Sequence, residues 1–196
     1  MMHPHTELKF INPIKGFGVV ATKLIPKGTI TWAFDELDHS FSPEQFDAFD
    51  ALYRETLYKY CYRNNTGEYI LCWDISRYVN HSFVSNCIST AYNFEIAIRD
   101  ILPGEELTDD YGYLNVSEPI SFPKEDGSDR EQVLPGDILT FYKKWDAMLE
   151  ESFASLDKVP QPLISLLPSA VREEARNIAV GRKKMESILS CYYKQQ

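Results

Sequence analysis

Hydrophobic residues occur in short runs over the first half of the chain. Residues 17–21 and 29–34 are rich in aromatic and β-branched side chains, and the turn sequence IPKG at 25–28 separates them. Further short runs of this kind follow at 69–73, 88–92, 94–99 and 106–108. This pattern predicts a domain built from short strands that are joined by tight turns.

Helical spacing replaces this pattern in two parts of the chain. In the first, apolar residues recur three or four positions apart: Phe46, Phe49, Leu52, Tyr53, Leu57 and Tyr60. Ser42, Pro43 and Gln45 precede them in the order typical of a capped helix start. In the second, the spacing runs almost to the last residue: Ile138, Phe141, Tyr142, Trp145, Met148, Leu149, Val171, Ala175, Ile178, Met185, Ile188, Leu189 and Tyr192. Gly181 interrupts this second series.

These patterns predict a β-rich α+β fold with a helical C-terminal tail. We expect one domain over residues 1–115, with a helical insert at 38–62. An acidic loop at 116–136, which contains the sequence EDGSDRE, would connect it to a helical region at 137–196.

Composition and charge narrow the classes of function. The chain has 196 residues, of which 44% are apolar and 25% charged, as in an ordinary globular protein. No apolar run approaches membrane-spanning length, and the N-terminal sequence MMHPHTELKF lacks the features of a signal peptide, so we expect a cytoplasmic protein. The net charge of −9 argues against direct nucleic-acid binding, which needs clustered cations, and favours a basic partner.

The residue types that bind metals do not occur at ligand spacing. The four cysteines form no Cys-x-x-Cys pair, and no two histidines stand at helical ligand spacing. We therefore expect free thiols and no bound metal.

Adjacent carboxylates in the sequence LTDDYGY, residues 107–113, are the first candidate for chemistry. Neighbouring side chains on a strand point to opposite faces, so Asp109 and Asp110 would diverge rather than bind one ion. The same rule places Asp109 on the face of Leu107 and Tyr111.

Two other motifs are weak when each is taken alone. The sequence KGFG at 15–18 permits close backbone approach to a ligand, and it is also a common turn before a strand. The sequence NHS at 80–82 is typical of a turn with local hydrogen bonds. A serine hydrolase is not indicated, because the chain has no Gly-x-Ser-x-Gly nucleophile elbow.

In their order and spacing, however, three segments resemble the hallmark segments of SET-domain protein lysine methyltransferases. They are KGFGVVATKLIPKGTI (15–30), RYVNHSFVSNC (77–87) and IRDILPGEELTDDYGY (98–113), and the resemblance spans residues 7–115. It implies a β-clip of small sheets with a pseudoknot, formed where the Asn-His-Ser segment passes beside the last motif.

The resemblance also implies a site. S-adenosyl-L-methionine would be held by Lys15, Gly16, Phe17, Gly18, Asn80, His81 and Tyr111. Tyr111 matches the catalytic tyrosine at the mouth of a lysine channel, with Tyr78 and Tyr113 as wall residues. The insert at 38–62 corresponds to the variable part of the peptide groove.

This sequence departs from the family pattern at two points. Asp109 stands where many relatives have Tyr or Phe, a position that helps to set the number of methyl groups added. It would either lie near the substrate amine or sit, solvated, at the channel rim; we expect the rim. Phe83 replaces a zinc-binding cysteine, and no cysteine cluster follows, so Phe122 or Trp145 would have to cover the adenine, although a core position is expected for Trp145.

The predicted activity is methylation of lysine in a basic protein substrate. Two alternatives remain: a non-catalytic interaction module with the same fold, and methylation of a non-protein amine.

Overall fold

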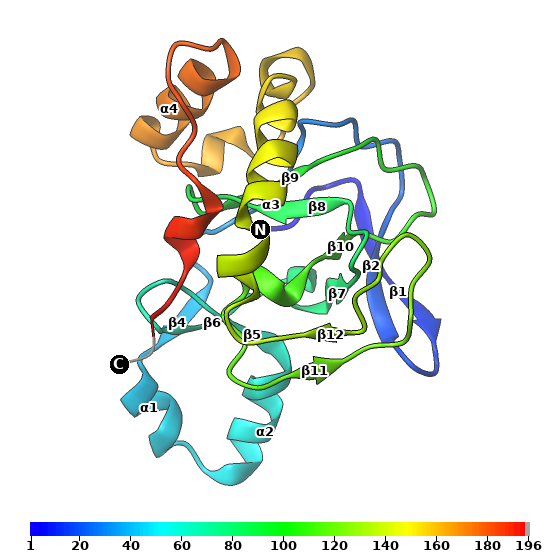
Figure 1. The fold of residues 1–196 in the computed structure, drawn as a ribbon, viewed down its shortest axis with the longest axis vertical. Coiled ribbons are helices and arrows are strands. Elements are labelled where there is room, and N and C mark those ends of the chain that lie inside the picture. The colour runs from blue at the N-terminus through cyan, green and yellow to red at the C-terminus, as the bar shows by residue number, and fades with distance from the viewer. Residues whose placement is uncertain (195–196) are drawn as a thin grey trace.

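The computed structural model describes residues 1–194, in which short strands form a central body and helices occupy its two ends (Figure 1). Within this range the strands form five sheets of two or three strands each. The three-stranded sheets have the orders β3-β9-β8, with bounds Ile30–Ala33, Phe94–Ala97 and Cys87–Ser89, and β4-β6-β5, with bounds His39–Phe41, Tyr69–Leu71 and Cys61–Arg63. The two-stranded sheets are β1-β2 (Thr6–Asn12, Gly16–Ala21), β10-β7 (Thr108–Asp109, Asn80–His81) and β11-β12 (Ile120–Ser121, Gln132–Val133). This mixed fold of small sheets with a helical C-terminal part confirms the predicted fold class.

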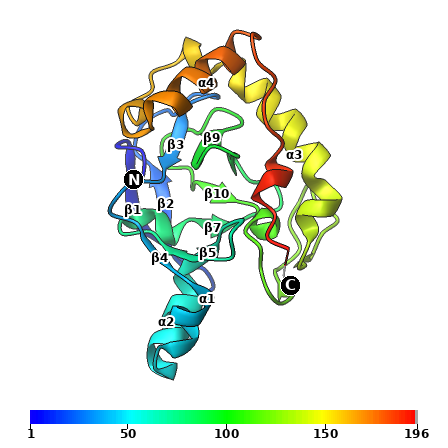
Figure 2. The same ribbon diagram turned by 90° about the vertical axis from the view of Figure 1, so that its left-hand side faces the viewer.

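Helices lie at opposite ends of the molecule in both views (Figures 1 and 2). At one end α1 (Pro43–Ala48) and α2 (Ala51–Tyr60) project away from the sheets, and at the other α3 (Asp137–Phe153) and α4 (Ser169–Ala179) cover them. Short 3-10 turns complete the chain: η1 (Ile75–Tyr78), η2 (Tyr111–Tyr113), η3 (Leu156–Lys158), η4 (Ile164–Leu166) and η5 (Ile188–Cys191). No helix within residues 1–194 is long and apolar enough to cross a membrane.

The largest hydrophobic core joins the sheet β3-β9-β8 to the C-terminal helices. Ile96 and Phe94 from β9 pack in the same cluster as Trp145, Leu149 and Phe153 from α3, and all five side chains are at least 95% buried. Truncating a buried aromatic of this kind to Ala costs about 3–5 kcal/mol, because transfer and cavity terms add. The helical tail is therefore part of the folded domain. Trp145 belongs to this core, as expected.

The pseudoknot predicted from the motifs centres on the sheet β10-β7. These two strands are parallel, with Thr108 opposite Asn80 and Asp109 opposite His81. The backbone N–H of Ser82 also donates to the carbonyl of Asp109 at 2.9 Å. The pairing brings two segments about 28 residues apart into direct contact, and it places Tyr111 immediately beyond both of them.

The helical insert differs from the single helix that its spacing predicted. The capping box at Ser42 and Gln45 is present and starts α1, as predicted. However, α1 ends at Ala48, and the side chain of Asp50 accepts from the Leu52 N–H at 2.9 Å to start α2. A second N-cap residue inside the periodic segment thus divides it into two helices.

Two other elements also differ from the prediction. The acidic loop at 116–136 contains the hairpin β11-β12, in which Ile120 pairs with Val133 and Ser121 with Gln132. Beyond Gly181, whose φ is +72°, the chain does not resume an α-helix and forms only the turn η5 before residue 194. Its apolar residues Met185 and Ile188 are nevertheless buried in the core.

Candidate functional site

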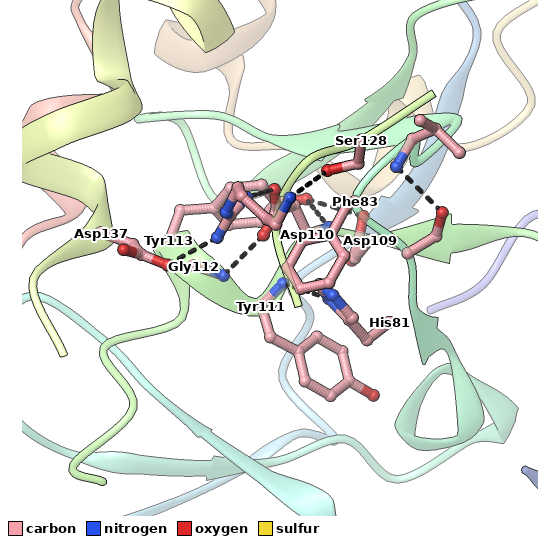
Figure 3. Close-up of polar contacts among 12 residues, drawn as sticks. His81, Phe83, Asp109, Asp110, Tyr111, Gly112, Tyr113, Ser128 and Asp137 are labelled. Carbon is pink, nitrogen blue, oxygen red and sulfur yellow. Dashed lines mark hydrogen bonds and ion pairs between the residues drawn. The ribbon is translucent and has the colours of Figure 1, made fainter. Parts of the chain in front are cut away.

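Asp110 builds the turn that presents Tyr111. Its carboxylate accepts from the Gly112 N–H at 3.0 Å, and its own N–H donates to the Tyr113 hydroxyl at 3.2 Å, so η2 begins with a capping box (Figure 3). Arg130 forms ion pairs with Asp110 and with Asp137 of α3, the latter at 2.6 Å. Asp110 is therefore a structural residue of the turn.

Tyr111 is held at both its backbone and its hydroxyl group. Its N–H donates to Nδ1 of His81 at 3.1 Å, and its hydroxyl donates to the carbonyl of Val79 at 2.7 Å. Burial raises the pKa of Tyr111, so the hydroxyl stays protonated at neutral pH. The side chain is fixed between the two motif segments and carries no charge.

The residues of the first and second motifs meet around the strand β2. Asn80 Nδ2 donates to the carbonyl of Phe17 at 3.0 Å and to Oε1 of Glu106 at 2.7 Å, while Lys15 Nζ lies 2.9 Å from Oε2 of the same carboxylate. A Cβ at Gly18 would lie 2.5 Å from Glu106 Oε1 and 2.9 Å from Asn80 Nδ2. Only glycine fits at residue 18.

Gly16 is required for a different reason. Its φ of +75° lies in the left-handed region, and its Cβ position is open. The structure thus brings the Lys15–Gly18 segment and Asn80 together through Glu106.

His81 is buried among aromatic rings and has one polar atom without a partner. Its ring lies 4.0 Å from that of Phe122, 4.3 Å from that of Phe83 and 5.3 Å from that of Tyr111, measured between centroids. Burial lowers its pKa to about 3, so the imidazole is neutral at pH 7. Because Nδ1 accepts from Tyr111, the ring proton resides on Nε2, which has no hydrogen-bond partner within residues 1–194.

A cavity of approximately 760 Å³ adjoins the other side of Tyr111. Its lining includes Tyr111, Tyr113, Asp109, Glu95 and Trp32, together with residues of α2 and β5. The Lys15–Gly18 segment, Asn80 and His81 do not line it. Tyr111 therefore separates the cavity from the cluster around His81.

Two expected channel residues lie in different environments. Tyr113 lines the cavity and is buried, and its hydroxyl donates to Oδ1 of Asp109 at 2.9 Å. Tyr78 does not line the cavity; its ring packs against Tyr60 at 5.3 Å and Phe17 at 6.5 Å. The role of Tyr78 in the channel wall stays a prediction, and its ring packs toward Phe17 of β2.

Asp109 does not sit, solvated, at a rim. Its side chain is 3% exposed, and it is hydrogen-bonded to the carboxyl group of Glu95 as well as to Tyr113. Burial raises the pKa of Asp109. The expectation of a solvated rim position is wrong, because β10 is covered on both faces; Asp109 lines the cavity that Tyr111 also lines.

Sequence reasoning missed Glu95 and Arg130. Glu95 stands in the otherwise apolar strand FEIA, and an acidic residue between two buried apolar neighbours was the one signal that could have identified it. Arg130 lies in the acidic loop and its partners are 7 and 20 residues away, so no local pattern indicated its role. Within residues 1–194, no three His, Cys, Asp or Glu side chains cluster as metal ligands would.

Comparison with known proteins identifies one family. The model of the SET domain family matches residues 16–112, a range that includes Gly16, Gly18, Asn80, His81 and Tyr111. A search of curated proteins found no significant match.

Proposed function

Because the chain belongs to the SET-domain family, we propose that it transfers a methyl group from S-adenosylmethionine to the side-chain amine of lysine in a protein substrate. The observation that carries this proposal is the position of Tyr111. Its ring lines the cavity on one side, and its backbone is bonded on the other side to His81, a residue of the second family motif.

The residues around His81 fit the proposed cofactor. The unpartnered Nε2 of His81 offers a buried donor, and the Cβ position of Gly16 is open, so no side chain covers the backbone of the 15–18 segment at residue 16. Backbone and amide groups of this kind, with an aromatic ring beside them, suit a ligand that joins an amino acid to an adenine. Lys15, Gly16, Phe17, Gly18, Asn80, His81 and Tyr111 would hold it.

Phe122, in the loop at 116–136, also supports a cofactor site around His81. Its ring lies 4.0 Å from His81 and 6.1 Å from Tyr111, so the β11-β12 hairpin covers the place where the adenine would lie. The hairpin thereby supplies a wall that relatives with a cysteine cluster build around zinc.

The bound cofactor would supply the methyl group from its sulfonium. The protein would contribute mainly by holding the amine and the cofactor in position. Attack on that methyl group must be in line, so the amine has to be held at a fixed distance and angle. The protonated hydroxyl of Tyr111, anchored on Val79, can accept from the amine without placing a negative charge beside the nucleophile. Enclosure in the cavity excludes water and lowers the pKa of the amine, which is about 10.4 in solution.

The shape of the cavity supports a peptide-borne amine. Tyr58, Lys59 and Tyr60 of α2 line it. The helices α1 and α2 project away from the sheets (Figure 2). We therefore place the peptide groove between this insert and the 116–120 segment, whose residues also line the cavity. The net charge of −9 suits a basic substrate.

A non-catalytic interaction module is the second candidate. The observation that favours it is Asp109, a carboxyl group at a position that is aromatic in many relatives. Such a module would need neither the Tyr111 hydroxyl nor turnover.

Substitution of Tyr111 separates the two candidates. We expect Tyr111→Phe to lower methyl transfer by about 10²-fold or more, because the hydroxyl that orients the amine is lost. Transfer is measured with a methyl-labelled cofactor on histones and ribosomal proteins as lysine-rich probes, and cofactor affinity by calorimetry. Tyr142→Phe, which changes a tyrosine of α3 outside the cavity lining, is the matched control. Unreduced transfer by Tyr111→Phe would contradict the proposed role.

A further inference from the structure

Two buried carboxyl groups, Glu95 and Asp109, line the cavity, which Lys59, Arg63 and Arg77 also line. Glu95 of β9 is 9% exposed and Asp109 of β10 is 3% exposed. Neither forms an ion pair with a lysine or arginine within residues 1–194, in contrast to the neighbouring Asp110. Buried carboxylates are normally paired with a cation, so this pair needs an explanation.

The hydrogen bonds of the pair show how it is charged. Two carboxyl groups can hydrogen-bond to each other only if one of them carries a proton. Burial raises the pKa of Glu95, and the charge of Asp109 and the hydrogen bond to it raise that pKa further, so Glu95 is the protonated partner. Asp109 accepts from Glu95 and from the hydroxyl of Tyr113 at 2.9 Å. At neutral pH the pair therefore holds one proton and one negative charge.

Resting on the proposed function above, we propose that the Glu95–Asp109 pair accepts the proton that a substrate ammonium must lose before it can attack. The ammonium N–H bond breaks and its proton passes to the Asp109 carboxylate, which leaves a neutral amine and two protonated carboxyl groups. The amine lone pair then forms the new N–C bond, and the electrons of the broken C–S bond remain on the sulfur of the departing thioether. The product is a secondary ammonium, and the proton on the pair returns to solvent.

The placement of the pair matches this role. Asp109 lies two residues before Tyr111 and both line the same cavity, so an amine beside the tyrosine hydroxyl is in the compartment that contains the pair. A single negative charge attracts the incoming ammonium. A carboxyl group with a raised pKa then approaches the lowered pKa of an enclosed amine, the condition under which proton transfer is efficient.

Other titratable groups face the pair from several elements, but none at neutral pH supplies a competing base. They are the α-ammonium of Met1, Tyr62 of β5, Cys72 after β6, Cys87 of β8, Asp110 after β10 and Tyr111 of η2. Burial raises the pKa of each phenol and thiol in this set, so these groups stay neutral. Burial also raises the pKa of Asp110, and Arg130 holds its carboxylate in an ion pair.

The pH dependence of two variants tests the proposal. Asp109→Asn should lower single-turnover methyl transfer to histone and ribosomal-protein probes by about 10²-fold at pH 7, because it removes the proton acceptor. The loss should shrink as the pH approaches the amine pKa of about 10.4, because a growing fraction of the amine is then neutral in solution. Glu95→Gln still donates to Asp109 but carries no proton to share, so it should shift the pH profile of transfer. Glu150→Gln, an exposed acid on α3, should leave the profile of the wild-type protein unchanged. A loss that is equal at all pH values, or no loss, would overturn the proposal.

A second readout does not depend on activity. Infrared difference spectra of the protein alone should show a protonated carboxyl band at pH 7 that Glu95→Gln lacks and Glu150→Gln keeps. Absence of that band in the wild-type protein would overturn the proposal that Glu95 and Asp109 share a proton. A wild-type protein that transfers no methyl group would overturn the proposed function and this role with it, whereas an active wild type with an unaltered Glu95→Gln pH profile would overturn this role alone.

Discussion

Asp109 and Asp110 are neighbours in sequence, yet their carboxylates lie in opposite electrostatic environments. Asp110 forms an ion pair with Arg130, which also binds Asp137, so two buried acids share one cation (Figure 3). Asp109 faces Glu95 in the cavity, and these two acids share a proton instead. The extended backbone of Asp109, the last residue of β10, and of Asp110, which follows it, produces the difference, because successive side chains of an extended chain point to opposite sides.

The comparison separates a structural region from a reactive one. Around Arg130 both buried carboxylates form ion pairs with one guanidinium, and the rings of Phe83 and Phe141 lie 4.6 and 4.4 Å from it. These contacts join the loop, η2 and α3. In the cavity, by contrast, neither Glu95 nor Asp109 forms an ion pair with a lysine or arginine within residues 1–194. Buried charge without a protein partner is typical of functional sites.

The largest effect is expected when the structural region loses its cation. Arg130→Ala should lower the free energy of unfolding by about 3–5 kcal/mol, because it leaves Asp110 and Asp137 buried without a counterion. Urea unfolding measures the change. Arg99→Ala, which breaks an exposed ion pair with Glu105, should cost less than about 1 kcal/mol. Equal losses in the two variants would remove the distinction between the regions.

An intermediate effect is expected from neutralising each aspartate in turn. Asp110→Asn should lower the free energy of unfolding by about 1.5–3 kcal/mol, since it weakens a charged hydrogen bond to a buried arginine. Asp109→Asn should change it by less than about 1 kcal/mol, because the substitution removes an unpaired buried charge and keeps an oxygen for Tyr113. A larger loss for Asp109→Asn than for Asp110→Asn would contradict the assignment of Asp110 to the structural region and of Asp109 to the reactive one. The same urea titrations provide both values.

The smallest effect, counted per pH unit, is a change in how stability depends on pH. An acid whose pKa is raised by folding stabilises the protein fully below its unfolded pKa, and this contribution is lost as the pH rises through the folded value. For the Glu95–Asp109 pair the loss begins near pH 4 and proceeds by at most about 1.4 kcal/mol per pH unit for each proton released.

Glu95→Gln should flatten this dependence, because Asp109 then has no second carboxyl group beside it. Unfolding measured at intervals from pH 4 to pH 8 gives the slope for each protein. Identical slopes in the variant and the wild type would show that the pair shares no proton.

Local patterns in the sequence were sufficient for the elements whose causes are local. Ser42 and Gln45 indicated a helix start, and Trp145 is in the core, as its helical spacing indicated. The order of the three motifs predicted the pairing of β7 with β10. In each case the structural element could be predicted from residues close in sequence or from the order of the motifs.

The remaining features depend on contacts between distant residues. Whether Asp109 is solvated depends on Glu95, 14 residues earlier, and on the helices that cover β10, so its own neighbours could not reveal its burial. Arg130 and the β11-β12 hairpin lie in a loop whose composition resembles that of a solvated segment. The ring of Tyr78 packs toward Phe17 of β2, and no periodic pattern indicates the direction of a side chain in a tight 3-10 turn such as η1.

Calorimetric titration of the protein with S-adenosylmethionine tests the central claim most directly, because it requires no assumption about the substrate. The account predicts saturable binding of one cofactor per chain, weakened by Gly18→Ala, whose Cβ would lie 2.5 Å from Glu106 Oε1. No detectable heat at two temperatures, with S-adenosylhomocysteine as well as with S-adenosylmethionine, would contradict it.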